Sequence, residues 1–226
     1  MANFYKKSHQ SGRSMIEMLG VLAIIGMLSL GSISAYSAAM FKHQLNQHME
    51  SFSLLLNNAI TLLPEMRRNY GKGIGNVSKL FADTSLLPAG MHYSNNAILD
   101  VFKNSLYISY YHIRNGNRDS SEYLMQINID RDNDKISSRA RAICRNVMMA
   151  AKENAANIWA VQMRSGSQAP DGGYSGTTLT GGTYNSGGRT KRLADASLTD
   201  LDEVCASCNS QRYCVIVLYI DVTFNK

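Results

Sequence analysis

Residues 14–40 form an apolar segment in which Glu17 is the only charged residue. As a helix, these 27 residues would be about 40 Å long at 1.5 Å per residue, which exceeds the roughly 30 Å hydrocarbon core of a bilayer. A buried helix in a soluble core is the alternative, but such helices are rarely this long and this free of charge. The segment therefore predicts a membrane-embedded helix that carries one carboxylate near its start.

Averaged over its full length, the chain has the composition of a soluble protein, because nearly all of its charged residues lie after the apolar segment. The 226-residue sequence has a mean hydropathy of −0.19 and a net charge of +6, and 45% of its residues are hydrophobic. Its densest basic stretch, residues 189–192, is too short to indicate a nucleic-acid-binding face, and a solvated loop explains it equally well. We therefore expect one modest domain attached to the apolar segment.

The helical pattern continues beyond the apolar segment as an amphipathic stripe. Apolar residues recur at spacings of three and four: Phe41, Leu45, Met49, Phe52, Leu56, Ala59 and Leu63. Pro64 lacks a backbone N–H and its ring crowds the preceding turn, so the helix is expected to end before it. One helix over residues 14–63, roughly 75 Å long, is predicted. A secretory signal is disfavoured because the apolar run is too long and no small-x-small cleavage site follows it.

The stretch Gly12-Arg-Ser-Met-Ile-Glu17, followed by Met-Leu-Gly-Val-Leu-Ala-Ile-Ile-Gly, resembles the prepilin signal of type IV pilins and the related pseudopilins. The resemblance implies that a membrane-embedded prepilin peptidase cleaves between Gly12 and Arg13 and methylates the new N-terminus on Arg13. Glu17 then takes the place of the family's glutamate, the fifth residue of the mature chain. Arg13 stands where the family usually has an aromatic or aliphatic residue, and the proline that many pilins carry in the apolar half is absent.

This resemblance gives the lone carboxylate a role. Cleavage would create a positive α-amine on Arg13, and we hypothesise that Glu17 of one subunit pairs with the Arg13 amine of a neighbour as the helix leaves the bilayer for a filament core. The alternative is that Glu17 only extends to the membrane interface. Gly31, Ala35 and Ala39 recur every four residues, a small-residue face that lets helix backbones approach closely.

Three regions follow from these patterns. Residues 1–12 form the leader, residues 13–63 the N-terminal helix and residues 64–226 a globular head. Within the helix, residues 13–40 are the transmembrane and filament-core part, and residues 41–63 are the amphipathic part. The basic residues Lys6, Lys7 and Arg13 predict that the short N-terminal end faces the cytoplasm.

The head is expected to combine an antiparallel sheet with helices. The patterns predict an irregular connection over residues 65–105, a hairpin of strands 106–114 and 122–130 with a turn beginning at Asn115-Gly116, a helix over 136–162, an exposed loop over 165–192 with one short hairpin around 174–184, and a strand over 212–224. Residues 130–134 depart from a calcium loop because Lys135 replaces the required glycine, and Asp134 is expected to cap the following helix. The order matches an α+β fold, a long N-terminal helix with a pilin-like α/β-roll head.

Four cysteines lie downstream of the apolar segment: Cys144, Cys205, Cys208 and Cys214. Four thiolates suffice for a zinc site, but the second CxxC of a zinc ribbon is missing, and an exported head favours disulfides. Four cysteines permit three connectivities. The family resemblance favours a bridge between the C-terminal region and the rest of the head, which implies that Cys144 pairs with one of the last three.

No nucleophile–base pair or metal-ligand spacing stands out among the five scattered histidines. An enzyme is therefore not expected, and neither is a metal or another cofactor. The resemblance instead implies a structural subunit of a type IV pilus, which resides in the bacterial inner membrane before assembly and in a surface filament afterwards. Adhesion, motility, DNA uptake and mating contact are all open as roles of that filament, and so is the IVa or IVb subclass.

The partners implied by the resemblance are further copies of the chain, the prepilin peptidase, the assembly platform with its ATPase, and a receptor on a host or cell surface. A minor pilin or a type II secretion pseudopilin is the close alternative. A monomeric, membrane-anchored binding protein is the alternative from another class, and it predicts no processing at Gly12.

Overall fold

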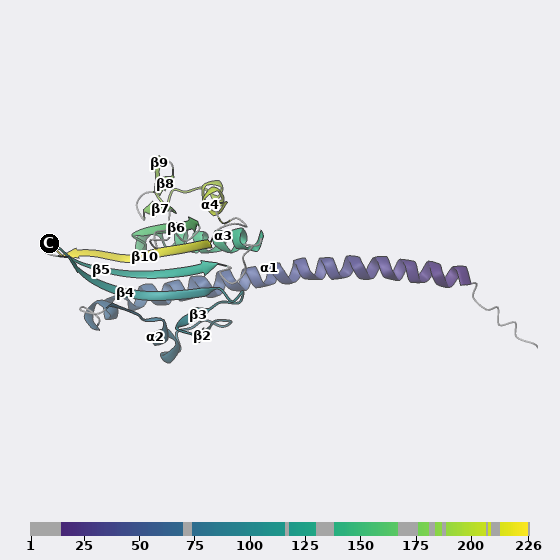
Figure 1. The fold of residues 1–226 in the computed structure, drawn as a ribbon, viewed down its shortest axis with the longest axis horizontal. Helices are drawn as coiled ribbons and strands as arrows, with labels where there is room; N and C mark the ends of the chain where they lie inside the picture. The colour runs from purple at the N-terminus through teal and green to yellow at the C-terminus, as the bar shows by residue number, and fades with distance from the viewer. Residues whose placement is uncertain are drawn as a thin grey trace, which may run out of the picture. The chain divides into compact units, whose positions relative to one another are not determined.

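The computed structural model describes residues 15–69, 74–115, 118–129, 138–166, 176–180, 184–186, 189–206, 208 and 213–225. The chain divides into two compact units, Met1–His43 and Gln44–Lys226, and one helix contributes residues to both. The fold is α+β, as predicted: a long N-terminal helix, an antiparallel sheet and further helices (Figure 1).

The N-terminal helix, α1, covers Met15–Asn69 and is 55 residues long. The prediction that it ends before Pro64 is wrong, because Pro64 lies inside it. A proline removes one backbone hydrogen bond from a helix interior. The next turn carries Met66, which is buried in the core of the head. Burial of this side chain stabilises the helix beyond the proline.

Ten strands form one sheet in the described residues, and every pairing in it is antiparallel. They are β1 (Ile74–Asn76), β2 (His92–Ser94), β3 (Ala97–Leu99), β4 (Ser105–Asn115), β5 (Arg118–Ile129), β6 (Ala160–Gly166), β7 (Gly176–Thr180), β8 (Tyr184–Ser186), β9 (Arg189–Lys191) and β10 (Tyr213–Asn225). The order across the sheet is β2-β3-β4-β5-β10-β6-β7-β8-β9, and β1 pairs with β4.

Two predicted strand features are confirmed. β4 and β5 form the expected hairpin, in register from Ser105 opposite Asn128 to Asn115 opposite Arg118. β10 matches the strand predicted near the C-terminal end, and it lies between β5 and β6. The residue Gly116 of the expected turn lies outside the described residues, as does the expected cap Asp134.

The shorter helices are α2 (Ser78–Asp83), α3 (Ser138–Glu153), a 3₁₀ turn (Ala155–Asn157) and α4 (Leu198–Cys205). The prediction of an irregular connection over residues 65–105 is therefore wrong in part, since α2 and the strands β1, β2 and β3 lie within it. These elements are short, and an 11–18-residue window of hydrophobic periodicity does not resolve them.

The predicted helix over residues 136–162 is wrong beyond Glu153. At the end of α3 the side-chain amide of Asn154 donates to the Ala150 carbonyl over 3.0 Å. The chain then enters β6, where Val161 and Met163 are buried and pair alongside β10. Tertiary pairing with a central strand outweighs local helix propensity here.

The prediction of an exposed loop over residues 165–192 is also wrong in part. β6 continues to Gly166, and β7, β8 and β9 add three more strands beyond it. β7 and β8 pair with Leu179 opposite Tyr184, which agrees with the short hairpin expected around residues 174–184. Backbone ladders form these strands without the apolar alternation that sequence patterns detect.

Helix α4 was not predicted, although its start carries a recognisable signal. Ser197 precedes the helix and accepts a hydrogen bond from the Asp200 backbone N–H over 3.2 Å, while the Asp200 carboxylate accepts from the Ser197 backbone N–H over 2.7 Å. This reciprocal capping box satisfies two N–H groups that the first turn leaves unpaired.

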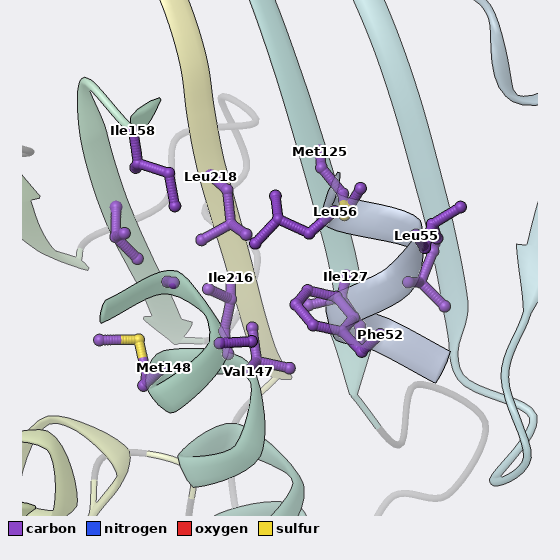
Figure 2. Packing of buried hydrophobic residues seen from close by; sticks show 14 of the residues in the cluster. Phe52, Leu55, Leu56, Met125, Ile127, Val147, Met148, Ile158, Ile216 and Leu218 are labelled. Carbon is purple, nitrogen blue, oxygen red and sulfur yellow. The ribbon is translucent and has the colours of Figure 1, made fainter. Parts of the chain in front are cut away.

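Helices α1 and α3 pack on the same face of the sheet and enclose the main core (Figure 2). Phe52, Leu55 and Leu56 of α1 meet alternate residues of the central strands, which are Met125 and Ile127 of β5 and Ile216 and Leu218 of β10. Val147 and Met148 of α3 lie beside them. The second part of α1 is thus a core element of the head, since its apolar stripe supplies much of the buried surface.

A buried polar pair connects α1 to the turn between β3 and β4. Nε2 of His48 lies 3.2 Å from the Asp100 carboxylate, and both side chains are fully buried. That carboxylate also accepts from the backbone N–H groups of Phe102 and Asn104, each over 2.8 Å. The His48 ring stacks on Phe52 with centroids 5.9 Å apart. The Asp100 carboxylate also accepts from the side-chain amide of Asn104 over 2.8 Å, so three hydrogen bonds satisfy it without His48. The two ring nitrogens of His48 have no hydrogen-bond partner among the described residues, and burying them carries a desolvation cost.

Tyr123 of β5 is fully buried, and its hydroxyl has no hydrogen-bond partner among the described residues. Burial raises the pKa of the Tyr123 phenol, because the phenolate would lose its hydration. The ring packs near Tyr110, with centroids 6.2 Å apart. The ring therefore stabilises the core, while the hydroxyl carries a desolvation cost.

Replacing Tyr123 by phenylalanine is expected to leave the free energy of unfolding unchanged or to raise it by about 1–3 kcal/mol, since the ring stays and the unpaired hydroxyl goes. Tyr123→Ala is the control, and it should lower the same free energy by about 3–5 kcal/mol. Urea denaturation of the detergent-solubilised chain measures both. A loss of more than about 1 kcal/mol in Tyr123→Phe would show that the hydroxyl is paired.

Candidate assembly and anchoring site

The first part of α1 exposes a continuous apolar surface. Its large exposed side chains are Met15, Ile16, Met18, Leu19, Val21, Leu22, Ile24, Ile25, Met27, Leu28, Leu30, Ile33, Tyr36 and Met40. The most apolar 18-residue window of this helix has 0% of its residues buried, and by length and composition the helix could cross a membrane. A signal sequence near an N-terminus meets the same criterion. An exposed apolar surface this large indicates a site that lipid or another protein covers.

Glu17 lies in the first turn of α1 and is exposed, with Ile16 and Met18 beside it in the sequence. A carboxylate in the first turn interacts favourably with the partial positive charge of the helix N-terminus. The predicted cleavage residues, Gly12 and Arg13, lie outside the described residues. The predicted pairing of Glu17 with the amine of Arg13 is therefore still a prediction.

The predicted small-residue face also lies on the exposed part of α1. Gly31, Ala35 and Ala39 are all exposed, and a spacing of four residues places them on one side of the helix. A Cβ built on Gly31 would meet nothing within 4 Å. The backbone is thus accessible to a second helix along this side, which is what close helix packing needs.

Serines in the apolar part of α1 satisfy their own hydroxyls. Ser29 donates to the Ile25 carbonyl over 2.8 Å, and Ser32 donates to the Leu28 carbonyl over 2.7 Å. Ser37 donates to the carbonyl three residues before it over 2.9 Å. Each bond removes an unpaired donor that would be costly in an apolar medium. Serine within a predicted apolar helix was the available sequence signal for these bonds, since its hydroxyl reaches the carbonyl of the preceding turn.

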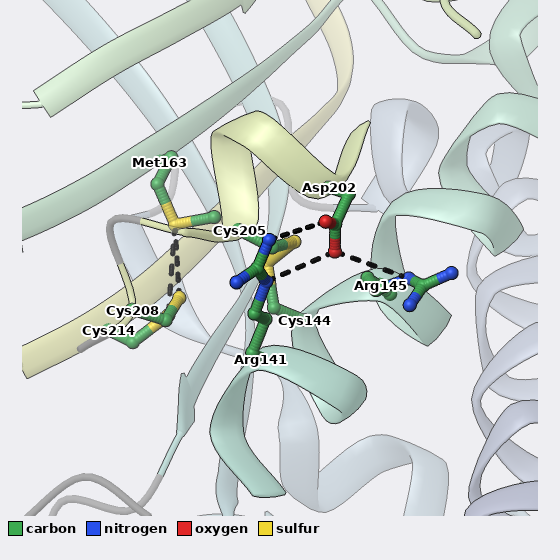
Figure 3. The surroundings of a disulfide bond; sticks show 8 residues. All are labelled: Arg141, Cys144, Arg145, Met163, Asp202, Cys205, Cys208 and Cys214. Atoms are coloured by element: carbon green, nitrogen blue, oxygen red, sulfur yellow. Dashed lines mark hydrogen bonds and ion pairs between the residues drawn. A yellow bond between two sulfur atoms is a disulfide. The ribbon is translucent and has the colours of Figure 1, made fainter. Parts of the chain in front are cut away.

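Two disulfides lie where α3, α4 and β10 meet (Figure 3). Cys144 of α3 pairs with Cys205, the last residue of α4, and Cys208 pairs with Cys214 of β10. The structure thus selects one of the three connectivities, and in it Cys144 has a partner among the last three cysteines. The described cysteines are all bonded in this way. The first bridge connects the end of α4 to the core helix α3, and the second connects the segment after α4 to β10.

An ion-pair cluster stands beside the first bridge. Arg141 of α3 donates through Nε to Asp202 of α4 over 3.1 Å, and Nη2 of Arg141 contacts the same carboxylate. Arg145 lies 3.6 Å from that carboxylate (Figure 3). The hydrogen bond from Arg141 lowers the pKa of the Asp202 carboxyl, and Arg145 acts in the same direction. These contacts are solvent-exposed, so they orient α4 on α3 more than they stabilise it.

The structure brings His48 and Asp100 together, and both side chains are fully buried, with the His48 ring in contact with the rings of Phe52 and Phe102. His43 and His92 are exposed at separate places on α1 and β2. The expectation that this protein is not an enzyme is untested by these positions and is kept as a prediction.

No protein family model, no curated protein and no solved structure matches this chain. The likeness to pilins therefore rests on the signal-like residues near the N-terminus and on the architecture, an apolar N-terminal helix followed by an antiparallel-sheet head.

The two bridges are expected to differ in their contribution to stability. Cys144–Cys205 closes a span of 61 residues and Cys208–Cys214 a span of 6. In the chain-entropy account, replacing the first pair by serine should lower the free energy of unfolding by about 4 kcal/mol, and replacing the second by about 2 kcal/mol. Equilibrium denaturation of the two double variants under oxidising conditions measures this. Equal losses, or a reversed order, would contradict it.

Proposed function

We propose that this protein is a structural subunit of a type IV pilus, processed by a prepilin peptidase and assembled into a filament through its N-terminal helix. The observation that carries the proposal is the exposed apolar part of α1, which leads into a helix stripe buried in a sheet-containing head. A helix that only closed a soluble core would not leave this surface uncovered.

Two environments can cover that surface in turn. The bilayer of the bacterial inner membrane covers it before assembly, and the same part of α1 in neighbouring subunits covers it in a filament core. The accessible backbone at Gly31 and the small side chains of Ala35 and Ala39 favour close packing between helices. The internally bonded serines lower the cost of either apolar environment.

Glu17 provides the specific contact in this proposal. A carboxylate costs several kcal/mol in a bilayer unless it is paired or reaches the interface. Cleavage after Gly12 would place a cationic amine on Arg13, four residues before Glu17 in the sequence. Pairing between Glu17 and the amine of an adjacent subunit would neutralise both charges and set the stagger between neighbouring helices.

The head suits export to an oxidising compartment, since both disulfides lie in the unit that follows the apolar part of α1. In the proposal, the basic N-terminal end stays in the cytoplasm and the head faces the other side of the inner membrane. The assembly platform and its ATPase would extract the subunit, and the head would be displayed on the cell surface, where a receptor could contact it.

Processing is the direct test. When the full chain is produced together with a prepilin peptidase, the mature chain is expected to begin at Arg13 and to carry one additional methyl group, as read from intact-mass and N-terminal peptide spectra. Gly12→Leu should block processing, because a side chain at the cleavage position excludes the chain from the peptidase site. A chain that keeps residues 1–12 beside an active peptidase would refute the pilin proposal and favour a membrane-anchored binding protein.

Glu17→Gln is expected to insert into the membrane normally but to lower the yield of sheared filaments by at least about tenfold, which corresponds to about 1.4 kcal/mol per subunit contact. Glu50→Gln is the matched control, since Glu50 is an exposed carboxylate on the same helix beyond the apolar part. Filament and membrane fractions are compared by immunoblot. Normal filaments from Glu17→Gln would exclude the pairing role.

A further inference from the structure

The central strands of the sheet have a second face, on the side away from α1 and α3. Along β5 and β10, residues of the main core alternate with a separate apolar cluster of Leu124, Val215 and Val217. Because successive side chains of a strand point to opposite faces, this cluster lies on the face opposite to the two helices. The outer face of the sheet, as we call it, presents Tyr107, Gln126, Gln162, Arg164, Val217 and Tyr219.

Four residues of the outer face stand in one row across the strands. Tyr107 of β4 is opposite Gln126 of β5. Gln126 is in turn opposite Val217 of β10, which is opposite Gln162 of β6. At about 4.8 Å per strand the row is roughly 14 Å long. Val217 is 1% exposed and the other three are partly exposed, so the row is an apolar floor between two amides, with an aromatic ring at one end.

The two amides of the row are held in fixed orientations. Nε2 of Gln126 donates to Oδ1 of Asn128 over 2.9 Å. Oε1 of Gln162 accepts from Nε of Arg164 over 2.8 Å and from the Tyr219 hydroxyl over 3.1 Å. Within the described part of the chain, Oε1 of Gln126 and Nε2 of Gln162 make no hydrogen bond. The row therefore offers a ligand one positioned acceptor and one positioned donor, on opposite sides of Val217.

Aromatic rings flank this floor. Tyr111 and Tyr219 pack against the cluster of Leu124 and its two valines. The ring of Tyr219 also meets the ring of Trp159 edge-on, with centroids 6.2 Å apart. Trp159 is 49% exposed and is the only tryptophan in the chain. Aromatic side chains in such positions supply contact area at a small cost in conformational entropy.

The outer face has almost no charge. Residues 105–111, 124–128, 160–164 and 215–219 contain one charged residue, Arg164, and no carboxylate. A nucleic acid needs several cations for its phosphates, and one arginine does not provide them. A peptide that adds a strand needs an open edge, whereas these four strands already pair on both sides. The charge of the face thus suits a ligand that is neutral or carries one negative charge.

We propose that the outer face of the sheet binds an oligosaccharide that is neutral or carries one acidic sugar. The C–H face of a pyranose ring lies on Val217 and against the tyrosine rings, as apolar surface does in ligand sites. A sugar hydroxyl both donates and accepts, so hydroxyls on the two edges of the ligand bond to Oε1 of Gln126 and Nε2 of Gln162.

This inference gives the chemical class of the receptor that the proposed function leaves open. Its role in adhesion rests on that proposed function, but the binding itself is a property of the head. Binding can therefore fail while processing at Gly12 succeeds, and the reverse, so the two proposals are tested separately.

The single tryptophan of the chain reports on this face. The full chain, in a zwitterionic detergent without a sugar head group, is applied to a printed array of neutral and sialylated oligosaccharides. The strongest binders are then titrated while the fluorescence of Trp159 is followed. At least one oligosaccharide is expected to bind saturably and to change the emission. Tyr107→Ala and Gln126→Ala should each weaken its binding by at least about tenfold, as truncation of a central contact does.

Two variants are the controls. Tyr107→Phe keeps the ring, Leu198→Ala removes an exposed apolar side chain on α4, and both should bind as the unaltered chain does. Melting temperatures identify any variant that has lost its fold. The proposal is overturned if no oligosaccharide on the array binds, or if both alanine variants bind as tightly as the unaltered chain.

Two other occupants of the face are distinguished by the same signal. Tighter binding of a single-stranded oligothymidylate than of any oligosaccharide, lost in Tyr107→Ala, would overturn the proposal in favour of a nucleic acid. A change in Trp159 fluorescence with protein concentration and without sugar, also lost in Tyr107→Ala, would overturn it in favour of a second copy of the chain.

Discussion

The packing of α1 against β5 and β10 is the contact on which the rest of the head depends. Phe52, Leu55 and Leu56 fill the space over the central strands, and His48 lies 3.2 Å from Asp100 in the turn between β3 and β4. The same helix therefore has two surfaces with opposite requirements. The apolar stripe in the second part of α1 is covered by this chain's own sheet. The apolar surface on residues 15–40 is exposed, and covering it requires lipid or other molecules.

The sequence predicts the division of α1 into an apolar part and an amphipathic part. The first part has a nearly uncharged run of residues, and the second has apolar residues at spacings of three and four. Both patterns are local, so they predict the helix well. The β4–β5 hairpin was predictable for the same reason, since its two strands are close in sequence. The α+β class followed from the order of these elements.

Other parts depend on contacts that a linear pattern does not contain. The helix predicted over residues 136–162 ends early because the chain that follows it forms β6, which gains a partner in β10 about fifty residues away. Pro64 is tolerated because Met66 is buried in a core that only the folded head provides. The position of β10 in the middle of the sheet could not be predicted either, because the apolar content of a strand indicates that it is buried but does not indicate which strands lie beside it.

At the candidate site, Glu17 and the small-residue face were predictable from residue type. The pairing of the cysteines was not, because it depends on where α3, α4 and β10 meet in the folded head.

The central position of β10 has a consequence for how the head is made. β5 and β6 do not pair with each other, so the strands from β6 to β9 are connected to the β1–β5 part of the sheet only through a strand that is synthesised after all of them. During vectorial synthesis the two parts of the sheet wait, each with an open edge, until β10 emerges to close the gap. During that interval an open edge of this kind can recruit a strand from another nascent copy.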